Sequence, residues 1–522
     1  MTTEKYPTGA DLLLAELAAQ GVDTCFANPG TTELDVVRSL ETQEAVRCVI
    51  GLQENVCTGA ADGYGRMLGR PAATLLHLGP GFANGIANLH NAKRAHTPIV
   101  NVIGDHTSWH LPYDAPLSSD IESLAWPVSG WVHRIESVAD AAPAAAQAVQ
   151  QSLAEGGQSA TLIFPADYQY GRLDAGADRG EGGSAAELSA SHFDLAATVQ
   201  ALRQAKSPLF LLGGGGALSG LGERAQKAVA RLCEALQGRA YAETFPARSE
   251  RGQGLPVFDR LPYFPEPARA VLDASDLVLL VGALAPVTYF GYEGHASEMV
   301  TPDRLLLLSR PGEDAATRLE ALAEALGAPA YVAPESPVPD APTGPLTPQK
   351  IAAVLARELP EQAIVSVEGG TCGYPFYAAS AAARVHTTLT NTGGAIGQGL
   401  PVAMGAAIAC PERPVVALVS DGSTQYTIQT LWSMAHEGLN VVVLVAANHQ
   451  YAILRNELRR GGAALGERAA ALTSLDNPRI DWVQLAQSYG LRASRAQTAE
   501  ELAAQFTQAV STAGPHLIEM AL

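Results

Sequence analysis

Short runs of valine, leucine and isoleucine recur along this chain, and helix-like stretches separate them. The strand-like runs lie at residues 46–52, 72–78, 98–103, 208–216, 276–282, 415–419 and 441–446. The helix-like segments lie at residues 55–67, 83–94 and 425–436. Strands that are apolar on both faces and are joined by helices form parallel sheets covered on both sides. The sequence therefore predicts an α/β fold built from parallel sheets.

Two segments have the composition of linkers between domains. Residues 171–191 are rich in glycine, alanine, serine and acidic side chains, and residues 333–348 are rich in proline. A chain of 522 residues is also too long for one hydrophobic core. We therefore expect three doubly wound parallel-sheet domains, at residues 1–170, 192–332 and 348–522.

The composition narrows the class of protein. The formal net charge of −19 argues against nucleic acid or an anionic membrane surface as partner, because both attract basic patches. No apolar run approaches the roughly 20 residues of a membrane span, and the first residues do not have the pattern of a signal peptide. The six cysteines are scattered and form no Cys-x-x-Cys pair. Reduced thiols in a cytoplasmic protein are the expected state.

A candidate metal site follows from the positions of two polar residues. The run at 415–419 leads directly to Asp421, and the next run leads to Asn448. Ligands bind at the carboxyl ends of parallel strands, so both side chains are expected at one rim. A carboxylate and an amide oxygen suit Mg²⁺ together with phosphate groups, and Gly422 and Ser423 would offer backbone N–H groups and a hydroxyl to those phosphates. Taken singly, Asp421 is typical of a helix N-cap and Asn448 of a turn residue, and each alone favours that alternative.

The segment SDGS, followed by a helix and AANHQYAILR, resembles the metal-binding signature of thiamine diphosphate-dependent enzymes. It departs from that signature at Ser420 and Ala447, neither of which supplies a metal-binding side chain in the family. The resemblance implies that Asp421, Asn448 and the backbone carbonyl of Gln450 hold Mg²⁺.

Two further segments carry the same resemblance and imply cofactor-binding residues. GLQENVCTGAADGYGRM is similar to the segment with the family's glutamate, which here is Glu54 and would face N1′ of the aminopyrimidine. The alternative is a solvated glutamate at a helix start. In TNTGGAIGQGLPVAMGAAIA, Ile396 is expected to support the bent cofactor. The resemblance also places Thr371, Gly394 and Tyr451 at the cofactor, and it implies pyrimidine-binding, central and diphosphate-binding domains in that order.

Within the family, the chain resembles benzoylformate decarboxylase and acetolactate synthase large-subunit-like proteins. NPGTTE places Thr31 where the decarboxylase binds substrate, and LLHLGPG places His77 at an active-site histidine that exchanges protons. A strand-end histidine bonded to a backbone carbonyl is the alternative for His77. The second active-site histidine of the decarboxylase is missing, because the matching position is Gly291. Tyr289, Tyr292 and His295 are candidates for its space.

The resemblance implies a 2-oxo acid decarboxylase with carboligase capacity, which uses thiamine diphosphate and Mg²⁺. An acetolactate synthase-like acyl-transferring enzyme is the alternative, and a non-catalytic cofactor-binding partner is a third. Related acetolactate synthases bind FAD in the central domain, but GGGGALSG is not a G-x-G-x-x-G motif, so FAD is not favoured. A homodimer or homotetramer with active sites at subunit interfaces is expected.

Overall fold

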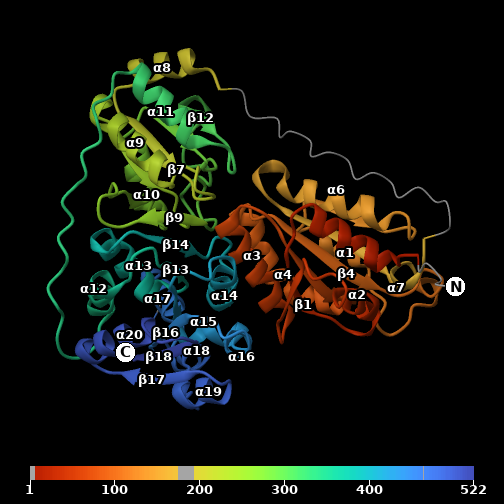
Figure 1. The fold of residues 1–522 in the computed structure, drawn as a ribbon. Coiled ribbons are helices and arrows are strands. Elements are labelled where there is room, and N and C mark those ends of the chain that lie inside the picture. Colours follow the sequence, from red (N-terminus) through yellow and green to blue (C-terminus); the bar gives the residue numbers. More distant parts are fainter. Residues whose placement is uncertain (1–5, 174–192, 463) are drawn as a thin grey trace.

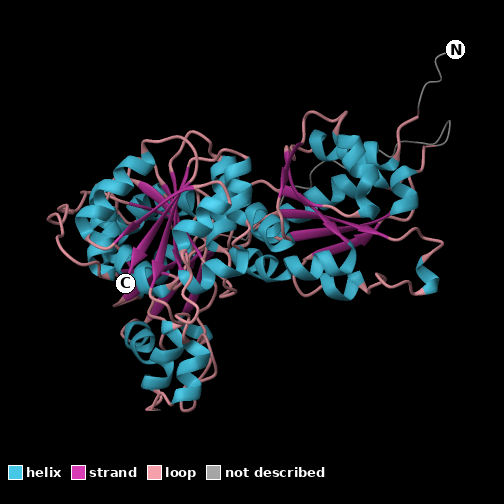
Figure 2. Cartoon of the chain, turned by 90° about the horizontal axis from the view of Figure 1, so that it is seen from below, coloured by secondary structure: helices cyan, strands magenta, loops and turns pink. Residues whose placement is uncertain are grey.

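The computed structural model describes residues 6–173, 193–462 and 464–522. Three separate sheets, each flanked by helices on both faces, confirm the predicted α/β class with three domains (Figures 1 and 2). The expected linker at 171–191 lies almost entirely outside the described residues. The second linker, 333–348, contains no strand, and a helix begins only at Pro348. In the described part of the chain, no helix has the length and apolar character needed to cross a bilayer.

The first sheet is wholly parallel and has the strand order β2-β1-β3-β4-β6-β5. Its strands are β1 (Thr24–Asn28), β2 (Arg47–Ile50), β3 (Ala72–His77), β4 (Ile99–Asp105), β5 (Trp131–Arg134) and β6 (Ser159–Pro165). Helices α1 (Gly9–Ala19) and α6 (Ala141–Leu153) cover one face with apolar side chains. Helices α3 (Glu54–Leu68) and α4 (Leu78–Ala95) cover the other face. They lie between the first sheet and the third domain (Figure 1).

The second sheet is also parallel and has the order β10-β8-β7-β11-β12. Its strands are β7 (Pro208–Leu212), β8 (Arg239–Ala242), β10 (Asp259–Arg260), β11 (Leu277–Val281) and β12 (Leu305–Ser309). Helices α8 (Leu195–Gln204), α9 (Glu223–Leu236) and α11 (Ala315–Ala325) pack on one face, and α10 (Pro265–Asp273) packs on the other.

The third sheet contains a strand from the middle of the chain. Its order is β17-β18-β16-β15-β13-β14-β9. Its strands are β13 (Ile364–Val367), β14 (His386–Thr390), β15 (Val415–Ser420), β16 (Val441–Ala447), β17 (Arg492–Ala496), β18 (His516–Ala521) and β9 (Arg248–Arg251). The edge strand β9 comes from the middle of the chain and runs antiparallel to β14. The central segment therefore extends the third sheet as well as forming its own.

Helices cover both faces of the third sheet. On one face lie α12 (Pro348–Glu358), α13 (Gly370–Ala379) and α20 (Ala499–Val510), and on the other lie α14 (Gly399–Ala409), α16 (Thr430–His436) and α19 (Trp482–Ser488). The single helix expected at 425–436 is interrupted, because a 3-10 turn (Gln425–Thr427) precedes α16. Within this turn, the Thr427 hydroxyl donates to the carbonyl of Gly397 at 2.8 Å and ties the segment to the loop before α14.

Helices α3 and α14 pack so closely that glycine is required at the contact. A Cβ atom on Gly63 of α3 would lie 2.2 Å from the carbonyl oxygen of Val402, and one on Gly405 of α14 would lie 1.9 Å from the carbonyl oxygen of Ala60. In both cases the obstructing atom is backbone, which cannot rotate away. The absence of side chains at these positions lets the first and third sheets share one apolar layer.

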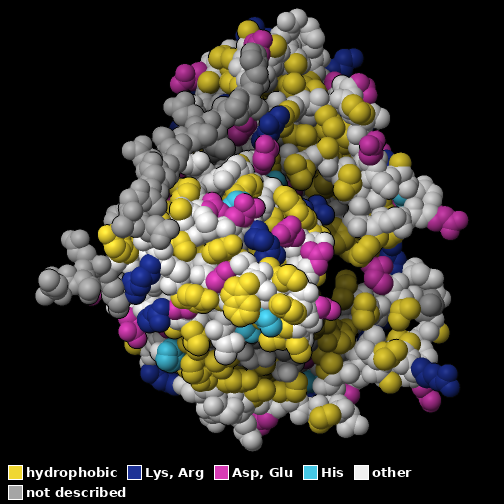
Figure 3. Space-filling view, turned by 90° about the vertical axis from the view of Figure 1, so that its right-hand side faces the viewer, with side chains coloured by type: hydrophobic (Ala, Val, Ile, Leu, Met, Phe, Trp, Pro, Cys, Tyr) yellow, Lys and Arg dark blue, Asp and Glu magenta, His cyan; other side chains and the backbone are white. Residues whose placement is uncertain are grey.

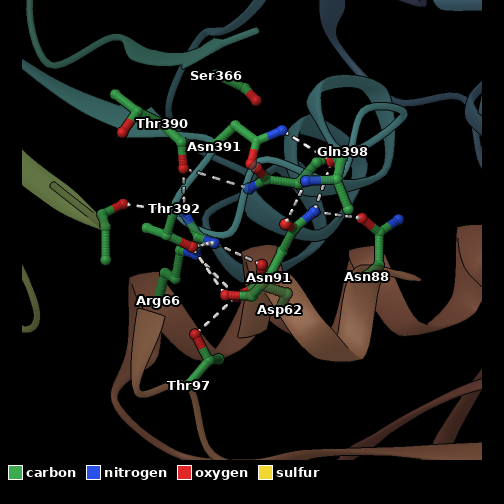
Figure 4. A network of polar contacts seen from close by, with 12 residues as sticks. Asp62, Arg66, Asn88, Asn91, Thr97, Ser366, Thr390, Asn391, Thr392 and Gln398 are labelled. Carbon is green, nitrogen blue, oxygen red and sulfur yellow. Dashed lines mark hydrogen bonds and ion pairs between the residues drawn. The ribbon is translucent and has the colours of Figure 1, made fainter. Parts of the chain in front are cut away.

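A buried ion pair fixes the same interface (Figure 4). On α3, the Arg66 guanidinium donates to both oxygens of Asp62, at 2.7 Å and 2.6 Å. Arg66 Nη1 also donates to the carbonyl of Thr390 at 2.6 Å and to that of Ala247 at 3.2 Å. Thr97 donates to Asp62 at 2.6 Å. One arginine therefore ties the first domain to backbone from the central segment and from the end of β14.

Substituting Gly405 with alanine is expected to destabilise the protein by about 1–3 kcal/mol, because the new methyl group forces α14 away from α3. The shift in the urea unfolding midpoint measures this effect. Gly216→Ala is the matched control, because its Cβ would have no atom within 4 Å. Alanine favours helices over glycine by about 1 kcal/mol, so a Gly405→Ala midpoint at or above that of the wild type would contradict the close contact.

Candidate active site

Asp421 and Asn448 lie at one rim of the third sheet. Strands β15 and β16 are parallel neighbours, with Ser420 opposite Ala446. Asp421 follows β15 as the first residue of the short helix α15 (Asp421–Thr424), and Asn448 follows β16. The continuous apolar strands thus bring the carboxylate and the amide to the same edge, as strand-end geometry requires.

Backbone and side-chain contacts hold the two groups in place. Asp421 is buried and accepts hydrogen bonds from the backbone N–H groups of Gly422 at 2.8 Å and His449 at 2.6 Å. Burial raises the pKa of this carboxyl, and the N–H groups lower it in part. Asn448 donates from Nδ2 to Thr371 Oγ1 at 3.1 Å, and its Oδ1 accepts from the backbone N–H of Gln450 at 3.1 Å. His449 adopts φ = 53°, so the chain turns sharply between Asn448 and Gln450.

These residues line a cavity of about 970 Å³. The lining includes every residue of the third domain that the sequence predicted for metal or cofactor: Thr371, Gly394, Ile396, Asp421, Gly422, Ser423, Asn448, Gln450 and Tyr451. One carboxylate, one amide oxygen and a backbone carbonyl form a hard oxygen donor set of the kind that Mg²⁺ prefers. The N-terminus of α13 at Gly370 and Thr371 adds backbone N–H groups suited to a diphosphate. The residues present therefore fit a Mg²⁺–diphosphate group.

Glu368 is a cavity residue that the sequence analysis missed. Its buried carboxylate accepts from the backbone N–H groups of Gly397 at 2.8 Å, Gln398 at 3.2 Å and Gly399 at 2.9 Å. Burial raises the pKa of Glu368, while these N–H groups oppose the shift. The bonds fix the loop that carries Ile396. Glu368 directly follows β13, so the strand-end rule that identified Asp421 would also have found it.

Glu54, His77 and Thr31 do not line this cavity. Glu54 is the first residue of α3 and is half-buried. Asn84 donates from Nδ2 to Glu54 Oε2 at 3.1 Å. A Cβ atom on Gly81 would lie 3.2 Å from Glu54 Oε1, so the glycine leaves that side of the carboxyl open.

His77 ends β3 and belongs to a small polar cluster. Its Nδ1 lies 2.9 Å from Glu33 Oε2 and 3.1 Å from Thr32 Oγ1. Glu33 is fully buried, and its Oε2 also accepts from the backbone N–H of Gly30 at 2.7 Å. A buried carboxylate therefore orients the histidine, and Thr32, not Thr31, contacts the ring. Thr31 is exposed at the start of a 3-10 turn (Thr31–Glu33).

Aromatic side chains form the end of the cavity nearest the central domain. Phe245, Tyr263, Tyr289, Phe290 and Tyr374 line it. The hydroxyl of Tyr289 would lie 2.8 Å from a Cβ on Gly394. Of the three side chains considered for the space of the missing histidine, Tyr289 therefore lines the cavity, whereas Tyr292 and His295 do not.

Comparison with known proteins gives a consistent assignment. Residues 7–124 match the N-terminal thiamine pyrophosphate-binding domain of thiamine pyrophosphate enzymes, and residues 368–520 match the C-terminal one. The chain is 45% identical to the "Putative acetolactate synthase large subunit IlvX" of Mycobacterium tuberculosis, and the match covers 98% of each chain. It is 31% identical to the benzoylformate decarboxylase of Pseudomonas aeruginosa, over 97% of each chain.

A solved structure is similar to this chain along its whole length. The thiamine diphosphate-dependent 4-hydroxybenzoylformate decarboxylase of Rhodococcus jostii superposes with a TM-score of 0.83 at 25% identity, and the match covers 99% of both chains. Thiamine pyrophosphate is another name for thiamine diphosphate. This chain therefore belongs to the thiamine pyrophosphate enzymes, of the benzoylformate decarboxylase and acetolactate synthase type.

Proposed function

We propose that this enzyme decarboxylates a 2-oxo acid and has carboligase capacity, with thiamine diphosphate and Mg²⁺ as cofactors. The observation that carries the proposal is the cavity at the strand ends of the third sheet, where Asp421 and Asn448 lie together. In the reaction, the bond between the carboxylate and carbonyl carbons breaks, CO₂ leaves, and a proton is added to the carbonyl carbon. When bound, thiamine diphosphate supplies the electron sink for this step.

Asp421, the Asn448 amide oxygen and the Gln450 carbonyl would hold Mg²⁺. The bond from Asn448 Nδ2 to Thr371 turns the amide so that Oδ1 faces away from Thr371. Gly422, Ser423, Thr371 and Tyr451 would contact the diphosphate end, and Ile396 with Gly394 would support the middle of the cofactor. The Tyr451 ring packs directly against the backbone of Gly422, because a Cβ atom on Gly422 would lie only 2.7 Å from that ring.

Glu54 would hold a proton against N1′ of the aminopyrimidine, with Asn84 fixing its other oxygen. His77 is the candidate for proton exchange with the substrate, and Glu33 orients it through Nδ1. Nδ1 is occupied by Glu33 and Thr32, so Nε2 is the atom left to carry the proton. Thr31 is a candidate contact for the substrate carboxylate. Its side chain is exposed, so it is free to contact a substrate bound in the cavity of another subunit.

A subunit interface would bring the two groups of residues together. Within one chain, Glu54 and His77 lie outside the cavity of Asp421. The first domain carries large exposed apolar side chains, among them Trp109 at 64% and Tyr113 at 74% exposure. Figure 3 shows apolar side chains gathered on that side of the molecule. We propose a homodimer or homotetramer, cytoplasmic in location, in which one subunit's Glu54 faces the partner's cavity.

The second candidate is acyl transfer to another 2-oxo acid or aldehyde, as in acetolactate synthase. The similarity to the M. tuberculosis protein at 45% identity favours it. Both reactions use the same cavity and the same glutamate, and they differ in whether a proton or an acceptor molecule takes the place of CO₂.

Removing metal and cofactor and then restoring Mg²⁺ with thiamine diphosphate is expected to restore turnover of 2-oxo acids to CO₂ and aldehyde. In Asp421→Ala, the affinity for the cofactor in the presence of Mg²⁺ should fall by about 10–100-fold, since a charged ligand is lost. Calorimetry measures this affinity. Asp476→Ala, at an exposed loop position, is the control. If pyruvate gives acetolactate as the main product, acyl transfer is the function rather than simple decarboxylation.

Glu54→Gln is expected to lower turnover by about 10²–10⁴-fold, because an amide cannot exchange a proton with the aminopyrimidine. Cofactor affinity should change far less, since the amide is similar in size and Asp421 is untouched. Steady-state kinetics and calorimetry separate the two effects. Normal cofactor-dependent turnover in Glu54→Gln would remove Glu54 from the mechanism.

Mixing the inactive variants Glu54→Gln and Asp421→Ala tests the shared active site. If each site combines two subunits, half of the dimers that form at random are mixed, and each mixed dimer regains one intact site. The mixture should then recover about a quarter of wild-type activity after subunit exchange. Light scattering gives the assembly state in the same solution. An active monomer, or no recovery despite proven exchange, would contradict the shared site.

A further inference from the structure

Two cysteines face each other on neighbouring strands of the first sheet. Strands β1 and β2 are parallel, and Cys25 of β1 lies directly opposite Cys48 of β2. Neighbouring strands lie about 4.8 Å apart, within the roughly 4.4–6.8 Å between Cα atoms that a disulfide spans. The spacing of the backbone therefore permits a covalent bond between the two side chains.

Both cysteine side chains lie on the same face of the sheet. Phe26 and Val49, which follow the two cysteines along their strands, both pack in the core shared with α3. Successive side chains of a strand alternate between faces, so Cys25 and Cys48 point to the opposite face. There the Cys25 thiol donates a hydrogen bond to the Cys48 sulfur. The two sulfur atoms are thus already in contact.

The two thiols differ in exposure and in acidity. Cys48 is exposed on the edge strand β2, whereas Cys25 is buried. The hydrogen bond from Cys25 lowers the pKa of the Cys48 thiol, although partial desolvation and the charge of Glu437 oppose this shift. The same contact raises the pKa of Cys25, and burial raises it further. Because the thiolate is the nucleophile, an oxidant is expected to react first with Cys48.

The other cysteines lack this combination. Cys57, Cys372 and Cys410 are buried, and burial raises the pKa of each thiol. Cys233 is half-buried, and burial raises the pKa of its thiol to about 12. Among the six cysteines, all of which lie within the described residues, Cys48 alone is exposed and has a thiol of lowered pKa.

We propose that Cys48 is a site of oxidation by peroxides, and that Cys25 converts the oxidised residue into a reversible disulfide. The Cys48 sulfur attacks hydrogen peroxide, the O–O bond breaks, and a sulfenic acid forms as one water molecule leaves. The Cys25 sulfur then attacks the oxidised sulfur, an S–S bond forms, and a second water molecule leaves with the Cys25 proton. Two thiols are oxidised, and one peroxide is reduced to two water molecules.

This pairing limits how far Cys48 is oxidised. Without a neighbouring thiol, a sulfenic acid reacts with more peroxide to give a sulfinic acid, which thiols do not reduce. A disulfide is reduced again by dithiols, and transient disulfides with a redox-sensing role occur in reducing compartments. The inference does not rest on the proposed function, because the state of the thiols is read without any turnover.

The test treats the full-length protein with hydrogen peroxide and maps its cysteines by mass spectrometry. Two of the six thiols per chain should be lost, and peptides joined through Cys25 and Cys48 should appear. Dithiothreitol should restore both thiols. In Cys25→Ala no joined peptides should form, dimedone should label the sulfenic acid of Cys48, and longer exposure should give a sulfinic acid that dithiothreitol does not reduce. Cys233→Ala removes a half-buried thiol elsewhere and should behave as the wild type.

A second variant, Cys48→Ala, changes an exposed position and should lose no thiols at the same peroxide concentration. Three outcomes would overturn the inference: an unreacted Cys48 in the treated wild type, a bond between the Cys48 residues of two subunits, or a sulfinic acid at Cys48 while Cys25 stays reduced. Oxidation of Cys48 to the same products in Cys25→Ala and in the wild type would also overturn it.

Discussion

The close contact between α3 and α14 is the constraint on which the rest of the structure depends. Gly63 and Gly405 allow each helix to touch the backbone of the other, so the first and third sheets share one core. The pair Asp62–Arg66 then anchors this contact to the end of β14. A buried pair of this kind is costly to break, because the remaining charge is left without a partner. The loop that follows β14 is therefore held from the side of the first domain.

That loop is fixed from its other side by Glu368, whose carboxylate binds three consecutive backbone N–H groups. Ile396 thus sits between two rigid supports, one in each domain. The contacts that hold it on both sides are all made within the chain. A site preorganised in this way spends less of its binding free energy on ordering the chain when cofactor and substrate bind.

The pattern of apolar runs was enough to predict the α/β class. It also predicted that Asp421 and Asn448 lie at one rim, because the end of each apolar run marks the end of a strand. The pattern missed β9, whose residues 248–251 are polar and find their place only through pairing with β14. It also predicted an unbroken helix at 425–436, where the structure has a 3-10 turn before α16. The contact between Thr32 and His77 depends on how a turn folds back onto a strand end, which spacing alone does not encode.

The net charge of −19 bears on how the proposed substrate reaches the cavity, because a 2-oxo acid would approach a protein of its own sign. Among the described residues that line the cavity, Arg260 is the only lysine or arginine, and it is packed against tyrosine rings. Local attraction for an anionic group would come from the backbone N–H groups at the N-terminus of α13, where Gly370 and Thr371 line the cavity.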